Sequence, residues 1–327
     1  MNFLIVGGGS IGKRHLRNLQ ILGYQNIWVL RRKHDSAFEL EHQVVIVTSF
    51  TEAAKIEFAA VFVCTPTSLH NEGIEFAVNN GAAIFVEKPL IHSRQALAET
   101  HSILTSGPVT FFIGFMLRFH PLVRRINEVL QSGSLGKVYS ARFSFGSYLP
   151  YWHPWEDYRD SYASRRELGG GVINTITHEL DLIQYLFGEP VSVYCEVGNT
   201  GMLGIEVEEQ CEAIFSYPDK LITLHLDYLQ KDYDRNIIIL CEEGKLTWDW
   251  HANEINLKQH RSEDQVIATP VDFEVNHLYI NELRTFLDLV GKGSVSHDLD
   301  FDHAVRNTEL MLLMHESGVQ GKKLRNE

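Results

Sequence analysis

Two short segments of this sequence carry side chains suited to acid–base chemistry. In the first, Lys88 stands in Glu87-Lys88-Pro89, directly after the apolar run 83–86. Because ligands of parallel sheets bind at the carboxyl ends of the strands, we expect Lys88 in a ligand-binding crevice. Pro89 restricts the backbone of Lys88 to extended conformations and so limits the directions of its side chain. An exposed lysine at a strand end is the alternative interpretation.

The second segment begins at the glycines 169–171 and continues as a predicted helix. Asn174, His178 and Asp181 follow at spacings i, i+4 and i+7, which predicts that they share one face of an amphipathic helix. A purely structural histidine is the alternative. Position 182 is Leu, so no second histidine completes a zinc motif, and we expect no metal site.

An aromatic segment with two prolines, residues 148–159, precedes these glycines. Rigid rings such as Trp155, together with Arg165 farther along the chain, suit a lid or wall over a polar substrate. A surface loop held by its own aromatic side chains is the alternative.

A glycine loop directly follows the first apolar run, 3–6. Its sequence Gly7-Gly8-Gly9-Ser10-Ile11-Gly12 matches G-x-G-x-x-G between a predicted strand and a predicted helix, 13–22. Gly7 is expected to make the tight turn, Gly9 to admit a pyrophosphate and Gly12 to allow close packing of helix on strand. The diphosphate is then expected at the helix N-terminus, near Ser10 and Ile11.

The second predicted strand, 27–30, ends in Arg31-Arg32 without an acidic residue at its tip. An acid at this point usually binds the ribose 2′-hydroxyl of NAD, whereas arginine suits the 2′-phosphate of NADP. We therefore expect NADP in preference to NAD. A solvated basic pair is the alternative.

The elements that must position these residues form two patterns. Up to residue 120, short apolar runs at 3–6, 27–30, 44–47, 60–64, 82–86 and 110–116 alternate with helical segments such as 68–80 and 93–105. This rhythm predicts an α/β fold, a doubly wound parallel sheet of the Rossmann type, as domain 1–120.

Beyond residue 120 the pattern becomes alternating, as in 137–147, where Phe143 and Phe145 face one side and Arg142 and Ser144 the other. Further alternating runs lie at 190–197, 209–217, 220–230, 235–242, 245–250 and 253–258, with helices at 122–132, 276–290 and 301–317. We predict an α+β domain, 121–327, with an open, mainly antiparallel sheet.

The composition restricts the partners and the compartment. The 327 residues carry a net charge of −13, and no basic stripe predicts a nucleic-acid or membrane partner. Four widely spaced cysteines form no C-x-x-C pair, which favours buried free thiols in a reducing compartment. With a strand predicted from residue 3, we expect no signal peptide, and a cytoplasmic protein.

Five motifs in one order resemble those of the glucose–fructose oxidoreductase / inositol dehydrogenase family (Gfo/Idh/MocA). They are the glycine loop, Thr65-Pro66-Thr67-Ser68-Leu69-His70, Val86-Glu87-Lys88-Pro89-Leu90, Leu117-Arg118-Phe119-His120-Pro121 and the helix with His178 and Asp181. The resemblance implies NAD(P)-dependent oxidation or reduction of a sugar, sugar derivative or nucleotide-linked sugar. It implies that Lys88 and His178 are catalytic, and that Thr65, Pro66, His70, Glu87 and Lys88 belong to the cofactor site.

One position departs from the family pattern. Members usually have aspartate four residues before the histidine, where this chain has Asn174. An amide can orient His178 or bind a substrate hydroxyl, but it cannot stabilise an imidazolium by charge. Either the imidazolium of His178 then lacks stabilisation by a charge at position 174, or the orienting role shifts to Asp181.

The sequence thus predicts an oxidoreductase that acts on a polyhydroxylated small molecule, with Arg118, Asn174, Trp155, Arg165 and Asp181 as substrate contacts. A reductase of a planar non-sugar ligand and a non-catalytic NADP(H)-binding sensor or scaffold are the alternatives. A sheet with one uncovered face invites pairing between copies, so we expect a homodimer or homotetramer.

Overall fold

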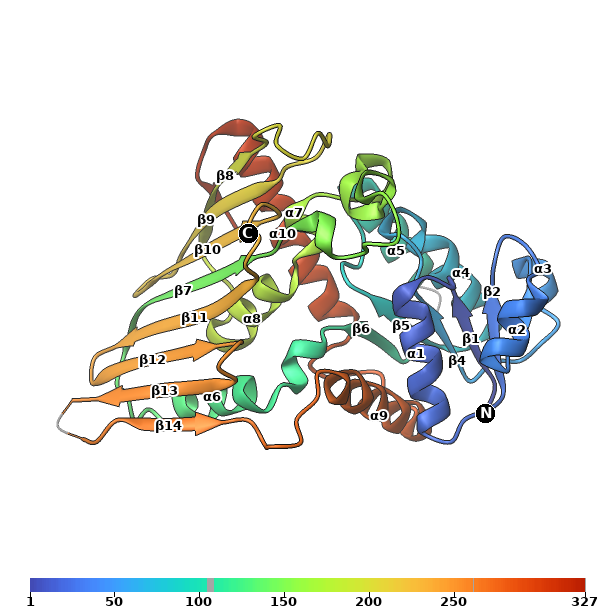
Figure 1. Ribbon diagram of the computed structural model, residues 1–327, viewed down its shortest axis with the longest axis horizontal. Helices are drawn as coiled ribbons and strands as arrows, with labels where there is room; N and C mark the ends of the chain where they lie inside the picture. Colours follow the sequence, from blue (N-terminus) through green and yellow to red (C-terminus); the bar gives the residue numbers. More distant parts are fainter. Residues whose placement is uncertain (105–108, 261, 327) are drawn as a thin grey trace. The chain divides into compact units, whose positions relative to one another are not determined.

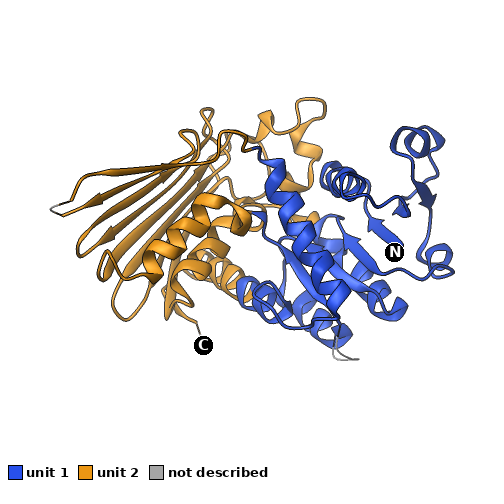
Figure 2. Ribbon diagram, turned by 90° about the horizontal axis from the view of Figure 1, so that it is seen from below, with its two compact units in different colours: residues 1–116, 274–308 blue, residues 117–273, 309–327 orange. Residues whose placement is uncertain are grey.

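The computed structural model describes residues 1–104, 109–260 and 262–326. Its contacts divide the chain into two compact units (Figure 2), one of residues 1–116 and 274–308, the other of residues 117–273 and 309–327. The first division lies close to the predicted boundary at residue 120. Residues 274–308, however, group with the N-terminal unit, so neither unit is continuous in the sequence.

The first unit contains a parallel sheet with the strand order β3-β2-β1-β4-β5-β6 (Figure 1). The strands are β1 Phe3–Val6, β2 Ile27–Leu30, β3 Val45–Val47, β4 Ala60–Val63, β5 Ala83–Glu87 and β6 Phe111–Gly114. Every residue of β1, β4, β5 and β6 is buried, as expected of strands covered by helices on both faces. The order is that of a Rossmann fold, which confirms the predicted fold class.

The helices of this unit are α1 Ser10–Ile21, α2 Ser36–His42, α3 Phe50–Ala53, α4 His70–Asn80, α5 Arg94–Leu104 and α9 Asn276–Lys292. Leu104 is the last described residue of the predicted helix 93–105, and residue 105 lies outside the described residues. The α9 helix joins the core through Phe286, whose ring centroid lies 5.5 Å from that of Phe62 and 5.7 Å from that of Phe112. This aromatic packing explains why a segment so late in the sequence belongs to the first unit.

The second unit contains a sheet with the order β14-β13-β12-β11-β7-β10-β9-β8-β15. The strands are β7 Val138–Gly146, β8 Ser192–Gly198, β9 Gln210–Ser216, β10 Leu221–Asp227, β11 Asp234–Cys241, β12 Gly244–Asp249, β13 Glu254–Gln259, β14 Gln265–Ala268 and β15 Leu324–Arg325. In the described part of the sheet, β7 and β10 pair in parallel and the other neighbours are antiparallel. The open, mainly antiparallel sheet is confirmed, whereas β14 and β15 were not predicted.

Helices cover one face of this sheet (Figure 2). The helices α6 Pro121–Gln131, α7 Val172–Thr175 and α8 His178–Phe187 contact strands β7, β9, β10 and β13, and α10 Phe301–Gln320 contributes its second half to the unit. Phe143 and Phe145 point to the covered side and are buried, while Arg142 on the other side is exposed. Alternation along β7 thus follows the prediction from its sequence.

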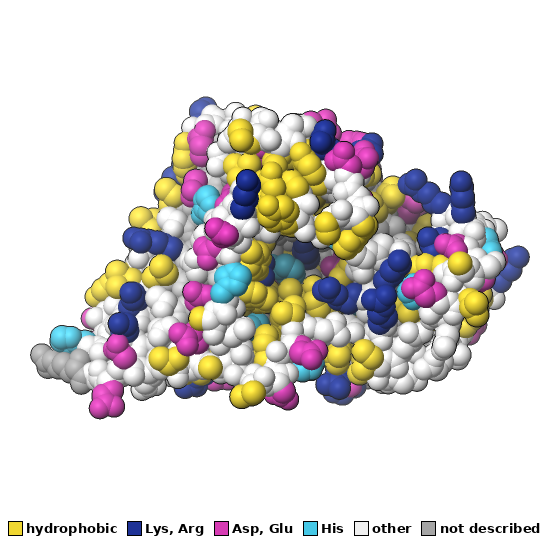
Figure 3. Space-filling view, viewed as in Figure 1, with side chains coloured by type: hydrophobic (Ala, Val, Ile, Leu, Met, Phe, Trp, Pro, Cys, Tyr) yellow, Lys and Arg dark blue, Asp and Glu magenta, His cyan; other side chains and the backbone are white. Residues whose placement is uncertain are grey.

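The distribution of charged side chains and the state of the cysteines agree with the predictions from the composition. Figure 3 shows Lys and Arg side chains interspersed with Asp and Glu on the face that it draws. All four cysteines are free and buried, as predicted. Within the described ranges, no helix is both long and apolar enough to cross a membrane.

Candidate active site

A cleft of about 530 Å³ lies in the first unit, at the carboxyl ends of strands β1, β2 and β4. The residues predicted for the cofactor site that line it are Gly7, Gly9, Arg31, Arg32, Thr65 and Pro66. A Rossmann sheet binds its ligand at this edge. The position and the lining of the cleft therefore agree with a dinucleotide site.

The glycine loop has the geometry that such a site requires. Gly7 has a φ of +107°, which side chains rarely adopt, and a Cβ at Gly12 would collide with the carbonyl oxygen of Gly7. At Gly9, by contrast, an added Cβ would meet no described atom within 4 Å. Gly9 is also the N-cap of α1, whose first turn contains no acidic residue. The first N–H groups of α1 are thus available to an anionic diphosphate.

The two arginines after β2 differ in their surroundings. The Arg31 guanidinium lies 4.1 Å from the centroid of the Phe38 ring and donates to Asp35 Oδ2 at 3.1 Å. Asp35 in turn caps α2 by accepting from the amide of Phe38. The Phe38 amide and Arg31 lower the pKa of this carboxyl. Arg32 is exposed at the cleft, so Arg31 is held in place while Arg32 faces solvent.

Buried histidines support the loops around the cleft. The Nε2 atom of His15 lies 2.6 Å from Glu87 Oε1, and His15 is fully buried in α1. His70 contacts two backbone oxygens, that of Leu90 through Nδ1 at 2.9 Å and that of Thr65 through Nε2 at 3.0 Å. His70 therefore links the loop after β4 to the loop after β5 and positions both. Lys88, at the end of β5, is half-buried.

In the second unit, the predicted helix through His178 is interrupted. The α7 helix ends at Thr175, Ile176 has a ψ of 54°, and α8 begins at His178. The expectation of one continuous helical face for Asn174, His178 and Asp181 is therefore wrong. Spacing alone cannot relate Asn174 to His178 across this break, because Ile176 leaves the helical conformation. His178 is buried, with 9% of its surface exposed.

Asn174 has partners on both sides of its amide. It donates from Nδ2 to the carbonyl oxygen of Gly170 at 3.1 Å, and its Oδ1 lies 2.8 Å from Nε2 of His315 on α10. Burial lowers the pKa of His315 to about 4. Close by, Glu208 Oε1 accepts from the amide of Ile173, and burial raises the pKa of Glu208 to about 6.

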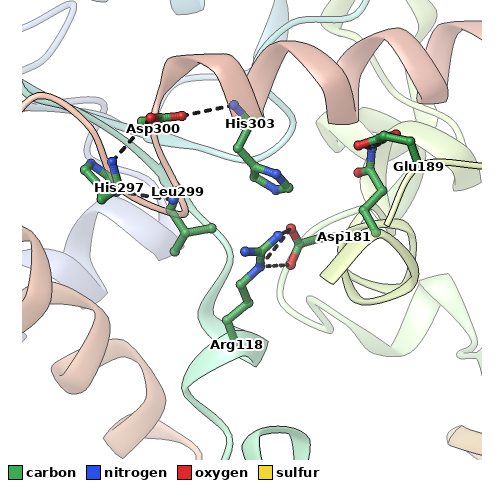
Figure 4. A network of polar contacts seen from close by, with 8 residues as sticks. Arg118, Asp181, Glu189, His297, Leu299, Asp300 and His303 are labelled. Atoms are coloured by element: carbon green, nitrogen blue, oxygen red, sulfur yellow. Dashed lines mark hydrogen bonds and ion pairs between the residues drawn. The ribbon is translucent and has the colours of Figure 1, made fainter. Parts of the chain in front are cut away.

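Arg118 and Asp181 form a buried ion pair (Figure 4). Nη2 of Arg118 lies 2.7 Å from Asp181 Oδ1, and Nε lies 2.9 Å from Oδ2. Asp181 is fully buried and Arg118 is 8% exposed. The guanidinium also lies 4.8 Å from the ring centroid of Tyr185. These contacts fix both side chains against each other and join the segment before α6 to α8.

The aromatic segment is partly held by its own rings. Trp152 donates to Ser147 Oγ at 2.8 Å and packs edge-on against Tyr228, whereas Trp155 is 74% exposed. Arg165 is also exposed and pairs with Glu167. Trp155 and Arg165 are thus the predicted substrate contacts that lie at the surface of this unit.

The first unit has a Rossmann sheet with a nucleotide-type cleft. The second unit has an open sheet and a buried histidine at the start of a helix. These features are typical of NAD(P)-binding oxidoreductases. Two family models match the chain: an oxidoreductase family with an NAD-binding Rossmann fold over residues 1–115, and the GFO/IDH/MocA C-terminal domain over residues 123–247. The chain belongs to the Gfo/Idh/MocA family.

Several known proteins are similar to this chain. The 2,7-anhydro-N-acetylneuraminate hydratase of Escherichia coli (strain K12) is 24% identical over 95% of this chain and 82% of that protein. The D-xylose 1-dehydrogenase (NADP(+)) 2 of Haloferax volcanii is 27% identical over 63% of each chain. The alignments to other curated relatives span little more than half of their length, 54% and 57%.

Among solved structures, a levoglucosan dehydrogenase in complex with NADH superposes with a TM-score of 0.89 at 15% identity. The match covers 99% of this chain and 98% of the other. At this identity the likeness shows the fold alone.

Sequence reasoning missed three supporting residues: His15, Glu208 and His315. His15 lies three residues after Gly12, on the buried side of the amphipathic helix α1. The helical spacing of the sequence is enough to place a histidine on that side. His315 lies 141 residues from Asn174, so no local spacing could have linked them.

Proposed function

We propose that this protein is an NAD(P)-dependent dehydrogenase or reductase that acts on a CH–OH carbon of a sugar, sugar derivative or nucleotide-linked sugar. The observation that carries the proposal is Lys88, which directly follows the β5 strand of a Rossmann sheet with a dinucleotide-type cleft. The membership of the family and the sugar dehydrogenases among the relatives support the same substrate class.

In the oxidising direction the bound cofactor supplies the hydride acceptor. His178 takes the proton of the substrate hydroxyl as a general base. Lys88 donates a hydrogen bond to the same oxygen and stabilises its negative charge as the C–H bond breaks. In the reducing direction His178 returns the proton to the carbonyl oxygen, while Lys88 keeps its hydrogen bond to the same oxygen.

The five predicted substrate residues divide by their surroundings. Trp155 and Arg165, which are exposed, are proposed to contact the substrate directly. Arg118 and Asp181, which bind each other, are proposed to position α8 and His178 at its start. Asn174 is proposed to hold the chain segment before His178 in place through its hydrogen bonds to Gly170 and His315.

Single substitutions test the catalytic assignment. Lys88→Ala and His178→Ala are expected to lower kcat by about 100-fold or more, because acid–base groups typically contribute that much. Lys55→Ala and His260→Ala, at exposed positions, serve as matched controls. Turnover of either site variant within a few-fold of the wild-type rate refutes the mechanism.

The assay panel should include sugars, nucleotide-linked sugars and planar carbonyl compounds, with products followed by NMR as well as by nicotinamide absorbance. A relative bears the name of a hydratase, so a product can form without net change in the cofactor. Turnover of planar compounds alone favours the non-sugar reductase. Tight NADP(H) binding without any turnover favours a sensor or scaffold.

We also propose NADP as the preferred cofactor. The basic residues Arg31 and Arg32 at the cleft suit a 2′-phosphate. Asp35, the nearest acid after β2 in the sequence, is engaged by the α2 amides and by Arg31. Arg32→Ala is expected to weaken NADP binding about tenfold and to leave NAD binding unchanged. Arg125→Ala, at an exposed position of α6, is the control, and equal loss for both cofactors refutes the preference.

A homodimer or homotetramer through the uncovered face of the large sheet is proposed as the assembly. That face presents apolar residues that are largely exposed, including Ile214 at 42%, Leu240 at 47% and Leu221 at 53%. Ile214→Glu is expected to dissociate the oligomer in sedimentation velocity, while Val319→Glu on α10 is not. A monomeric wild-type protein at micromolar concentration refutes the assembly.

The compartment and the excluded partners are proposals too. The four buried, unbridged thiols support a reducing, cytoplasmic location. The net charge of −13 supports a protein that binds neither nucleic acid nor anionic membranes.

A further inference from the structure

Asn174 is held between a glycine turn and the C-terminal helix of the second unit. Its Nδ2 atom donates to the carbonyl oxygen of Gly170 at 3.1 Å, and its Oδ1 atom lies 2.8 Å from Nε2 of His315. Only 6% of its surface is exposed. Two elements far apart in the sequence thus meet at one amide.

The chemistry of the partners fixes which atom carries the hydrogen. A backbone carbonyl only accepts, so the NH₂ group of Asn174 faces Gly170 and its oxygen faces His315. His315 must therefore donate from Nε2, which leaves Nδ1 unprotonated in the neutral ring. Burial, and secondarily the positive charge of Arg166, lowers the pKa of His315 to about 4, so the ring is neutral near pH 7.

We propose that His315 is a positioning residue of the active site, which fixes the Asn174 amide and through it the chain segment that leads to His178. After Asn174 the chain completes α7, leaves the helical conformation at Ile176 and begins α8 at His178. Three residues separate Asn174 from His178, and the helix break among them removes the usual rigid connection. The hydrogen bond from α10 replaces part of that rigidity.

The network also requires an amide at position 174. A carboxylate there would place an acceptor oxygen opposite the carbonyl oxygen of Gly170, where no proton is available. Its negative charge beside His315 would favour the protonated imidazole. Asparagine at this position is thus matched to a neutral histidine on α10. The link to catalysis rests on the proposed function, whereas the match between the two side chains does not.

The first experiment needs no substrate. In the full-length protein with labelled histidines, NMR is expected to show His315 as the Nε2–H tautomer at pH 7. In Asn174→Asp the titration midpoint of His315 is expected to rise by about one pH unit or more, because an opposite charge lies beside the ring. A wild-type Nδ1–H tautomer, or an unchanged midpoint in Asn174→Asp, overturns the proposal.

The second experiment measures turnover. His315→Leu is expected to lower kcat roughly five- to tenfold with little change in KM. This fold-change corresponds to the loss of about one hydrogen bond. His315→Gln, which can donate from the same side, is expected to stay within about threefold of wild type. His260→Leu, at an exposed site, is the control. Equal kcat for His315→Leu and wild type overturns the positioning role. If wild type turns over no substrate, the proposed function fails and the tautomer and titration results alone decide this proposal.

Discussion

The buried ion pair of Arg118 and Asp181 allows a sharp test of what these two predicted substrate residues do. Asp181 is fully buried, Arg118 is 8% exposed, and three N···O distances between them lie between 2.7 and 3.1 Å. Asp181→Leu would remove the carboxylate that pairs with the buried Arg118 guanidinium. Breaking a buried pair in this way costs about 3–5 kcal/mol.

The double variant Arg118→Met/Asp181→Leu removes both charges and fills the space with apolar atoms. Replacing a whole buried pair is often neutral or stabilising. We therefore expect the double variant to recover at least about 2 kcal/mol of the loss in Asp181→Leu. Together with the single variant Arg118→Met, these measurements complete a double-mutant cycle, which gives the coupling free energy between the two side chains.

Urea unfolding followed by tryptophan fluorescence is the suitable assay. Four of the five tryptophans, Trp152, Trp155, Trp248 and Trp250, lie in the second unit together with the pair, so the signal reports mainly on that unit. The exposed pair Arg125–Glu128 on α6 provides the control: Glu128→Leu is expected to cost less than about 1 kcal/mol. An equal cost for Asp181→Leu and Glu128→Leu, or a double variant no more stable than Asp181→Leu, refutes the reasoning.

Three further substitutions test the two units separately. Gly12→Ala is expected to abolish NADP(H) binding, measured by calorimetry, because its Cβ would collide with the carbonyl oxygen of Gly7; wild-type affinity contradicts this. Burial lowers the pKa of His120 to about 4, so His120 binds a proton more readily in the unfolded chain than in the folded protein. The stabilisation of the folded state that is present above pH 6.5 is therefore lost as the pH falls towards 4. His120→Asn, which keeps an N-cap side chain, should remove about 3 kcal/mol of that pH dependence in urea unfolding; an unchanged pH dependence rules out this histidine as the cause. Tyr228→Phe should lower the free energy of unfolding by about 1–2 kcal/mol, because the Tyr228 hydroxyl donates to the carbonyl of Gly171 at 2.8 Å, and no loss would show that this carbonyl needs no such donor.

The sequence by itself determined the local elements and the nucleotide end of the site. Continuous apolar runs identified β1, β4 and β5 because strands buried on both faces need no polar residues. Alternation identified β7 and its neighbours because one face of their sheet is uncovered. The glycine loop was readable because steric constraints at Gly7 and Gly12 act over a few residues.

Tertiary structure alone decided the long-range partners. The joining of α9 to the first unit depends on the ring contact between Phe286 and Phe62. The sequence around either phenylalanine gives no sign of this contact. The helix break at Ile176 went unpredicted, since the residues around it keep a helical pattern.

The roles of the site residues divide in the same way. The motifs and their resemblance to the family predicted roles for Lys88, His178, Arg118 and Asp181. Only packing showed that Arg118 and Asp181, 63 residues apart, bind each other. Only packing showed that Asn174 faces His315. Periodicity encodes which face of an element is buried, whereas the partner of a buried polar group is set by how the elements meet in space.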